Sequence, residues 1–145
     1  MTWKDALKRA QTRFADNGQF LLRPGESIGR VVSREKVPTG RGVYIIFRGR
    51  SRERPVYIGK AGTIRADGSW KDQGLRKRLR MKQQGESRGK FFRKLMAEKS
   101  SAGLKFVWFV THNRNSKVIP ALVEMELLQA HYDSYGCLPE LNKSA

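Results

Sequence analysis

The chain has a single cysteine, Cys137, among its 145 residues. One thiol cannot form an internal disulfide, so a disulfide-stapled fold is excluded and a reducing compartment is allowed. The first residues, Met1–Asp5, lack the apolar core of a signal peptide. No apolar run approaches the ~18 residues that a bilayer span needs. We therefore expect a cytoplasmic protein without a membrane partner.

Acidic residues are also scarce. The chain has 13 Asp and Glu but 30 Lys and Arg, which gives a net charge of +17 and a pI near 10.7. Such an excess attracts polyanions, and nucleic acid is the commonest polyanionic partner of a small basic domain. A membrane surface is the alternative, but no segment combines a basic and a strongly apolar face over ~20 residues. Charge that serves solubility alone is the third interpretation. The composition thus favours nucleic acid.

The length and a hydrophobic content of 39% suit one domain, 1–145, with an N-terminal helix and extension (1–41) and a motif-bearing core (42–142). Apolar residues at helical spacing from Trp3 to Phe14 predict a first helix that ends near Asn17. Residues 20–41 are expected to loop, with a short strand around 28–32. Strands are predicted at 42–47, 55–59 and 104–110, the first two as an antiparallel hairpin, and helices at 75–84, 90–99 and 119–135. The expected fold class is α/β (α+β), with a small, mainly antiparallel three-stranded sheet flanked by helices.

Two tyrosines lie on the predicted hairpin. If its strands pair with odd position sums, Tyr44, Tyr57 and Gly59 share one face, and Gly59 leaves room there for a phosphate. A phenol ionises near pH 10, so it can act as a base near neutrality only where positive charge lowers its pKa. Lys60 and the basic helix that begins at Leu75 offer such charge. Tyrosines are common in strands, so a purely structural role stays open.

Five short motifs follow one another in the order Gly42-Val-Tyr, Tyr57-Ile-Gly-Lys-Ala, Leu75-x-x-Arg, Glu124-x-x-Leu-Leu and Pro139-x-Leu-Asn. In this order they resemble the GIY-YIG nuclease family over residues 42–142. The resemblance implies a three-stranded antiparallel sheet with flanking helices. It also implies a metal-dependent endonuclease that uses Mg²⁺ (or Mn²⁺) to hydrolyse phosphodiester bonds of double-stranded or branched DNA.

The resemblance also assigns catalytic roles to individual residues. Tyr44 and Tyr57 match the signature tyrosines, one of which activates the attacking water. Lys60 and Arg78 would steady charge on the phosphate, and Glu124 would bind the metal. Helical spacing puts Glu124 beside Leu127 and Leu128, so it is expected to point toward the sheet. The alternatives are Glu126 as the metal ligand, an ordinary ion pair for Glu124, and Arg76 or Arg80 in place of Arg78.

Other residues are expected to bind substrate. Basic side chains would contact the DNA backbone, while Gly59 and Asn142 match the glycine beside the phosphate and the terminal asparagine of the family. Asn142 has two further interpretations, which are holding the end of the chain and capping a turn. The full predicted set of substrate-binding residues is Gly59, Lys71, Arg76, Lys82, Lys90 and Asn142.

The sequence departs from the family pattern at two places. A loop at 62–74, with Arg65 and Trp70, lengthens the connection after the second tyrosine motif and is either a DNA contact or a surface excursion. The stretch 133–138 is surplus, which affects the alignment of Glu124 and Asn142. Two rivals to the nuclease are a non-catalytic DNA- or RNA-binding module of the same fold and a basic scaffold for protein partners. The small size suggests modest specificity or a homodimer.

Overall fold

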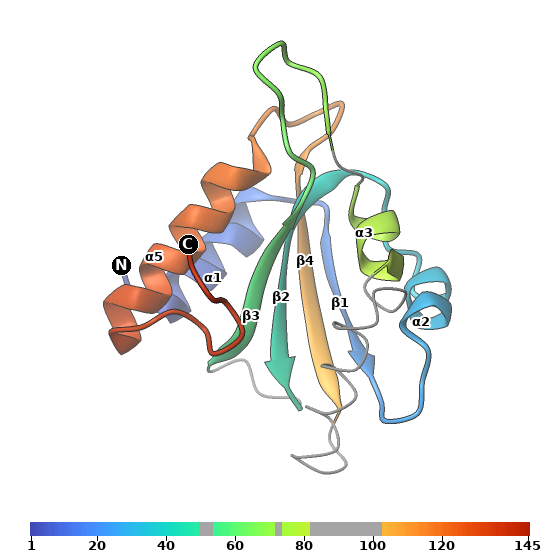
Figure 1. Ribbon diagram of the computed structural model, residues 1–145, viewed down its shortest axis with the longest axis horizontal. Coiled ribbons are helices and arrows are strands. Elements are labelled where there is room, and N and C mark those ends of the chain that lie inside the picture. The colour runs from blue at the N-terminus through green and yellow to red at the C-terminus, as the bar shows by residue number, and fades with distance from the viewer. Residues whose placement is uncertain (50–53, 72–73, 82–102) are drawn as a thin grey trace.

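Four strands form a single antiparallel sheet in the residues that the computed structural model describes, which are 1–49, 54–71, 74–81 and 103–145 (Figure 1). Their order across the sheet is β1-β4-β2-β3. The strands are β1 (Asn17–Leu22), β2 (Arg41–Arg48), β3 (Pro55–Ala61) and β4 (Leu104–His112). The described helices are α1 (Trp3–Arg13), α2 (Ile28–Arg34), α3 (Leu75–Met81) and α5 (Pro120–Tyr135). The mixed α+β class is confirmed, but the sheet has four strands and not the predicted three.

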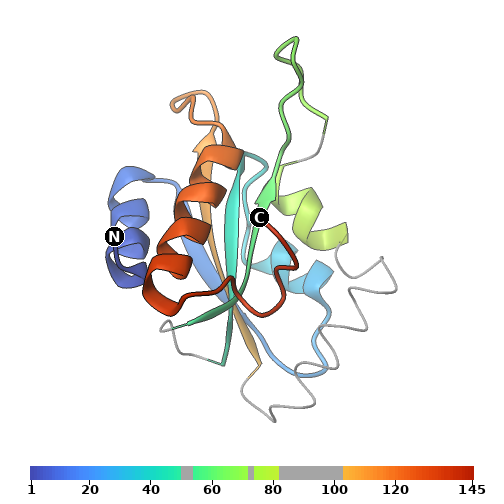
Figure 2. The same ribbon diagram turned by 60° about the vertical axis from the view of Figure 1, so that its left-hand side comes forward.

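Helices cover both faces of this sheet, with α1 and α5 on one face and α2 and α3 on the other (Figures 1 and 2). The central strand β2 supplies both cores because successive side chains of a strand point to opposite faces. Val43 and Ile45 pack with α1 and α5, whereas Tyr44 and Ile46 pack with α2 and α3. β3 is an edge strand, so residues on either face can meet around its outer side.

The added strand is β1, in a segment that the sequence assigned to a helix end and a loop. The first helix ends at Arg13, and the Asn17 side chain donates to the Phe14 carbonyl at 2.6 Å in the turn that follows. β1 then pairs along its length with β4, from Asn17 opposite Phe109 to Leu22 opposite Leu104. Asn17-Gly18 is a turn signal by itself. The long strand β4 supplies a pairing partner that local sequence does not reveal.

The predicted short strand at 28–32 is wrong, because Ile28–Arg34 forms helix α2. β-branched residues suggested a strand. However, Ile28, Val31 and Val32 also have the i, i+3, i+4 spacing of one helix face, and all three are buried. Packing of that face in the core outweighs the β preference.

The other predicted elements agree with the structure within a few residues at each end. Strands 42–47, 55–59 and 104–110 correspond to β2, β3 and β4, and helix 119–135 corresponds to α5. Helix 75–84 corresponds to α3 as far as residue 81, while its last turn and the predicted helix 90–99 lie outside the described residues. Within the described part of the chain, no helix has the length and apolar character needed to cross a bilayer.

Candidate active site

The two motif tyrosines lie on the face of the sheet that α2 and α3 cover. Tyr44 is opposite Gly59 and Ile46 is opposite Tyr57, so the position sums are odd and the predicted shared face is confirmed. The two tyrosine rings are 5.9 Å apart between centroids, with 34° between their planes. The Tyr44 side chain is buried, whereas Tyr57 is half-buried. Of the two phenols, Tyr57 is therefore the one that solvent reaches.

Gly59 makes room for these rings. A Cβ added at Gly59 would lie 2.5 Å from Cζ and Oη of Tyr44 and 2.7 Å from Cε2 of Tyr57. The expectation that Gly59 leaves a bare patch of backbone is thus corrected, because the Tyr44 ring fills this space. Gly42, the first motif glycine, is constrained too, since its Cβ would lie 1.8 Å from the Phe109 carbonyl oxygen. Both motif glycines have a packing role.

Three charged residues from distant parts of the sequence come together at the outer edge of β3. Lys60 is on β3 itself, Arg78 is on α3, and Glu124 is in the first turns of α5. The charges of Lys60 and Arg78 both act on the Glu124 carboxylate. Because α3 and α5 lie on opposite faces, this cluster spans the β3 edge of the sheet. We call Lys60, Arg78 and Glu124 the edge cluster.

The Glu124 carboxyl is partly withdrawn from water. Burial raises its pKa above the ordinary 4.5, and the positive charges of Lys60 and Arg78 only partly oppose this rise. A carboxylate that burial destabilises gains from additional positive charge nearby. Glu126, the alternative metal ligand, points elsewhere and pairs with Arg13 of α1 at 3.2 Å. The fold therefore separates the two glutamates and brings Glu124 to the edge cluster.

The three arginines of α3 differ in their surroundings. Arg76 donates from Nε to the Val37 carbonyl at 2.7 Å, so its guanidinium helps to hold α3 on the chain that follows α2. Arg80 is exposed. The Nε of Arg78 is buried and has no hydrogen-bond partner in the described part of the protein. Arg78 is thus the arginine whose surroundings suit an incoming anion.

Asn142 holds the C-terminal segment against β3. Its side-chain amide accepts from the Ile58 N–H at 2.9 Å and donates to the Ile58 carbonyl at 2.8 Å, and the Leu141 N–H donates to the Val56 carbonyl at 3.0 Å. These bonds satisfy backbone groups on the outer side of the edge strand. Of the three expectations for Asn142, holding the end of the chain is the one that its contacts match. Its partner Ile58 directly precedes Gly59 on the motif strand.

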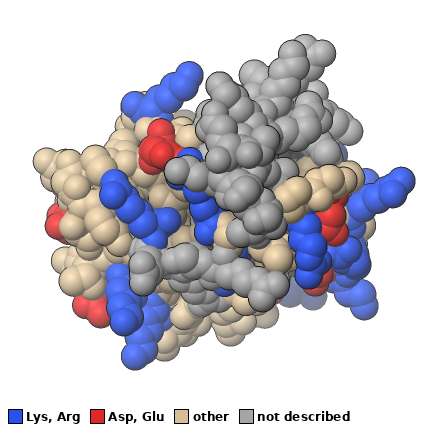
Figure 3. Space-filling view, turned by 90° about the horizontal axis from the view of Figure 1, so that it is seen from below, with Lys and Arg blue, Asp and Glu red and all other residues tan. Residues whose placement is uncertain are grey.

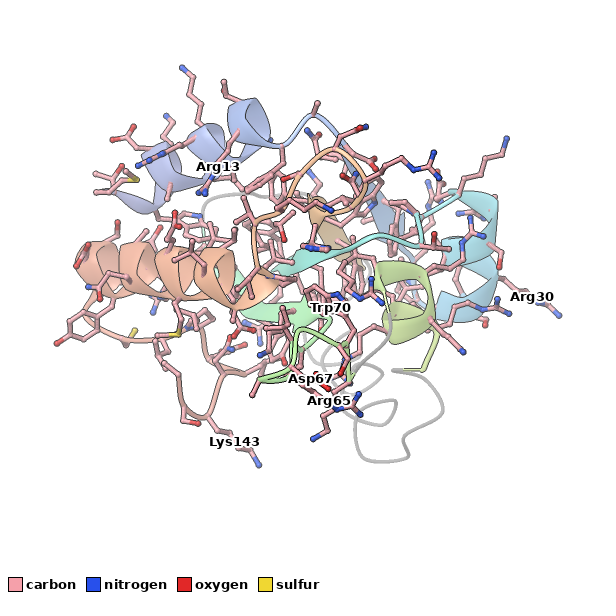
Figure 4. All side chains as sticks on the ribbon, turned by 90° about the horizontal axis from the view of Figure 1, so that it is seen from above. Arg13, Arg30, Arg65, Asp67, Trp70 and Lys143 are labelled. Carbon is pink, nitrogen blue, oxygen red and sulfur yellow. The ribbon has the colours of Figure 1, made fainter. Side chains whose placement is uncertain are left out.

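The loop at 62–74 begins as a small hairpin that projects beyond the sheet (Figures 1 and 4). Ile64 and Trp70 form an antiparallel bridge at its stem. The Trp70 ring lies 4.6 Å from the His112 ring, and the Arg41 guanidinium lies 4.5 Å from the Trp70 centroid. Burial, followed by the charges of Lys117 and Arg41, lowers the pKa of His112. The sequence pointed to Trp70 but missed Arg41 and His112, because only the fold brings them together.

On the face that Figure 3 shows, the described Lys and Arg side chains lie at several separate places. Lys71 is exposed at the base of the hairpin, where its N–H donates to the Thr63 carbonyl at 2.8 Å. Lys82 and Lys90, two other predicted DNA contacts, lie outside the described residues. Charge alone therefore does not define a binding site, and the edge cluster is the more specific feature.

The donor set at the edge cluster fits Mg²⁺ in one respect. Magnesium often takes one or two carboxylates and completes its shell with water and substrate phosphate. Glu124 offers one partly desolvated carboxylate. No group of three His, Cys, Asp or Glu suited to a metal occurs among the residues that the structure describes. A metal here would depend on substrate phosphate and water for its other ligands.

Neither the models of known protein families nor the curated protein sequences include one that matches this chain. The family resemblance therefore rests on the five motifs alone. Three of those motifs supply Lys60, Arg78 and Glu124, which meet at the edge of β3.

Proposed function

We propose that this protein is a metal-dependent endonuclease of the GIY-YIG type that hydrolyses DNA phosphodiester bonds. The observation that carries the proposal is the edge cluster beside the tyrosine pair. Lys60, Arg78 and Glu124 are 64 positions apart from first to last (124 − 60), yet their charges interact. Residues of three separate motifs thus lie within electrostatic reach of one another beside the edge strand β3.

Each residue of the edge cluster and each of the two motif tyrosines has a role in this proposal. Arg78 and Lys60 bind the non-bridging oxygens of the scissile phosphate and stabilise the negative charge that grows in the transition state. Tyr57 is half-exposed, so its phenol oxygen is the one that can orient or deprotonate the attacking water. Tyr44 is buried against Gly59 and supports the position of Tyr57. Glu124 is the carboxylate that would hold Mg²⁺ or Mn²⁺.

The metal, when bound, would supply positive charge to the phosphate and to the leaving oxygen. The raised pKa of Glu124 is consistent with this role, because a carboxylate that is costly to keep charged in the free protein gains most from a cation. The high positive charge of the chain supports DNA as the substrate.

Incubation of the purified chain with supercoiled plasmid tests the proposal. We expect nicked and then linear DNA with Mg²⁺ or Mn²⁺, and intact plasmid when EDTA is added. Glu124→Gln serves as the matched control, since it removes a charge with almost no change in volume. Intact plasmid with both metals, at protein concentrations where a gel shift shows full binding, contradicts the nuclease.

A non-catalytic nucleic-acid-binding module is the second candidate. The observation that favours it is the single carboxylate of the edge cluster, which is flanked by two cations. Lys60 and Arg78 could then bind a phosphate and neutralise Glu124 without any metal. Salt-sensitive DNA binding that is unchanged by EDTA, together with intact plasmid, would support this module.

A further inference from the structure

The exposed large hydrophobic residues gather around one helix. Seven such residues are found in the described part of the chain, and five of them belong to α5 or to its N-cap residue Ile119. Met1, a sixth, is beside α5, because its amino nitrogen lies 3.6 Å from the Asp133 carboxylate. Ile64, on the projecting hairpin, is the exception. Apolar residues that gather on one part of a surface usually mark an interaction site.

On α5 these residues form a narrow stripe. Leu122, Met125 and Tyr132 are 52%, 49% and 56% exposed, and exposed Gln129 lies between them. The steps 122, 125, 129 and 132 are three, four and three residues, which is the spacing of the contact positions in a two-helix coiled coil. The exposure of these residues means that no described element covers this side of α5. The helix thus presents a stripe suited to another helix.

The charge of the chain restricts what can approach this stripe. Residues 118–142 contain no Lys or Arg, although the whole chain has 30 in 145 residues. The acidic residues on the α1 side of the stripe already have partners, since Glu126 pairs with Arg13 and Asp133 with the amino group of Met1. Two copies with a charge of +17 repel one another over most of their surfaces. The stripe itself carries no Lys or Arg, and Arg13, which lies beside it on α1, is paired with Glu126, so like-charge repulsion is weaker here than over most of the surface.

We propose that α5 is a homodimer interface, in which the stripe of one protomer packs antiparallel on the same stripe of a second copy. A two-fold axis across the helices pairs Leu122 with the partner subunit's Tyr132, and Met125 with the partner subunit's Gln129. Such a contact is isologous, so a single helix face supplies both halves of the interface. A polar Gln129 within the stripe favours one register over its neighbours.

Sedimentation equilibrium of the full chain tests this proposal. The contact uses one helix per protomer, so we expect weak association, with the mass rising from 16.6 kDa toward twice that value between about 1 and 500 µM. Leu122→Glu combined with Met125→Glu should remain monomeric. Ile64→Glu is the matched control, because it changes an equally apolar, 36% exposed residue away from α5 and should dimerise like the wild type. Circular dichroism checks that each variant is folded.

Disulfide cross-linking tests the orientation. Cys137 is exposed and is the sole cysteine, so Cys137→Ser gives a background without thiols. In that background, Leu122→Cys mixed with Tyr132→Cys should form a mixed disulfide faster than either protein cross-links with itself. Faster self-linking of either protein overturns the antiparallel arrangement. A wild-type mass that stays at 16.6 kDa throughout, or an equal loss of association in Ile64→Glu, overturns the interface itself.

Discussion

Gly59 lies directly opposite Tyr44 in the β2–β3 pair, and the Tyr44 ring occupies the space that a side chain at position 59 would need. The contact involves the hydroxyl end of Tyr44, and Tyr57 approaches the same point from the neighbouring position on β3. The glycine, the buried phenol and the half-buried phenol are therefore one packing unit. A change at any one of the three alters the position of the other two.

Gly59→Ala should destabilise the protein by about 1–3 kcal/mol, the usual cost of adding volume to a packed core. The new Cβ would meet Tyr44 at 2.5 Å, so the rings must shift. Gly29→Ala in α2 is the control, since its Cβ would meet nothing closer than Ser27 Oγ at 3.8 Å and should stabilise by about 0.5–1 kcal/mol. Urea unfolding of both variants gives the two values. Equal stability of Gly59→Ala and the wild type would disprove the packing role.

Glu124→Gln should abolish plasmid nicking and leave DNA binding nearly unchanged, because it removes the proposed metal ligand with little change in volume. Glu126→Gln should cleave normally, since Glu126 pairs with Arg13 away from the edge cluster. Nicking rates at saturating Mg²⁺ measure both effects. The reverse pattern would make Glu126 the ligand, and normal cleavage by both variants would remove the metal assignment.

Tyr57→Phe should slow cleavage by ~10²-fold or more, the usual contribution of a positioned acid or base. Tyr44→Phe should have the smaller effect, because the Tyr44 side chain is buried against Gly59. Single-turnover rates on pre-bound DNA, with thermal melts as the folding control, separate chemistry from packing. Wild-type rates in both variants would leave these tyrosines with a structural role alone.

Arg78→Ala and Lys71→Ala should separate catalysis from general DNA binding. Lys71 is exposed, so its loss should reduce the slope of log affinity against log salt by about one unit and leave the rate on bound DNA unchanged. Arg78→Ala should slow cleavage of bound DNA far more than it weakens binding, because its charge is at the edge cluster. Should Arg78→Ala behave like Lys71→Ala, Arg78 belongs to the general basic surface and Arg80 becomes the next residue to test.

His131 should make the fold sensitive to mild acid. The side chain is fully buried, and its Nδ1 lies 2.6 Å from the Cys137 carbonyl oxygen. Burial and the charge of Arg54 lower its pKa below 6.5, although the hydrogen bond to Cys137 opposes them. Because the folded-state pKa is lowered, the contribution of neutral His131 to folding stability is fully present above pH 6.5. This contribution is lost as the pH falls through the folded-state pKa.

Thermal melts of the wild type and His131→Gln between pH 7.5 and 5 check this expectation, as an order-of-magnitude test of linkage. The wild type should lose several degrees more of Tm than the variant over this range. Parallel pH profiles for the two proteins would show that His131 does not control the acid response.

The structure of this protein follows from local sequence more clearly in the part from β2 onward than in the segment between α1 and β2. Strands β2, β3 and β4 are runs of β-branched and aromatic residues bounded by polar or glycine-rich segments, so local preference and burial agree. Helix α5 likewise begins with a proline suited to its first turn. Helix α1 also follows from its apolar spacing, whereas between α1 and β2 the local signals are weak. β1 needs β4 as a partner, and the buried face of α2 overrides the strand preference of its β-branched residues.

The sequence by itself determined which residue types were present for chemistry, their order in the chain, the shared face of Tyr57 and Gly59 on one strand, and the strong positive charge. The pairing register of the fold added Tyr44 to that face. Only the tertiary structure decided that Glu124 and not Glu126 reaches Lys60 and Arg78, and that Gly59 packs against phenol rings. The physical reason is the distance along the chain between the residues that decide each feature. A strand's alternation follows from neighbouring residues, whereas the edge cluster depends on two helices that pack on opposite faces of the sheet and carry side chains to its β3 edge.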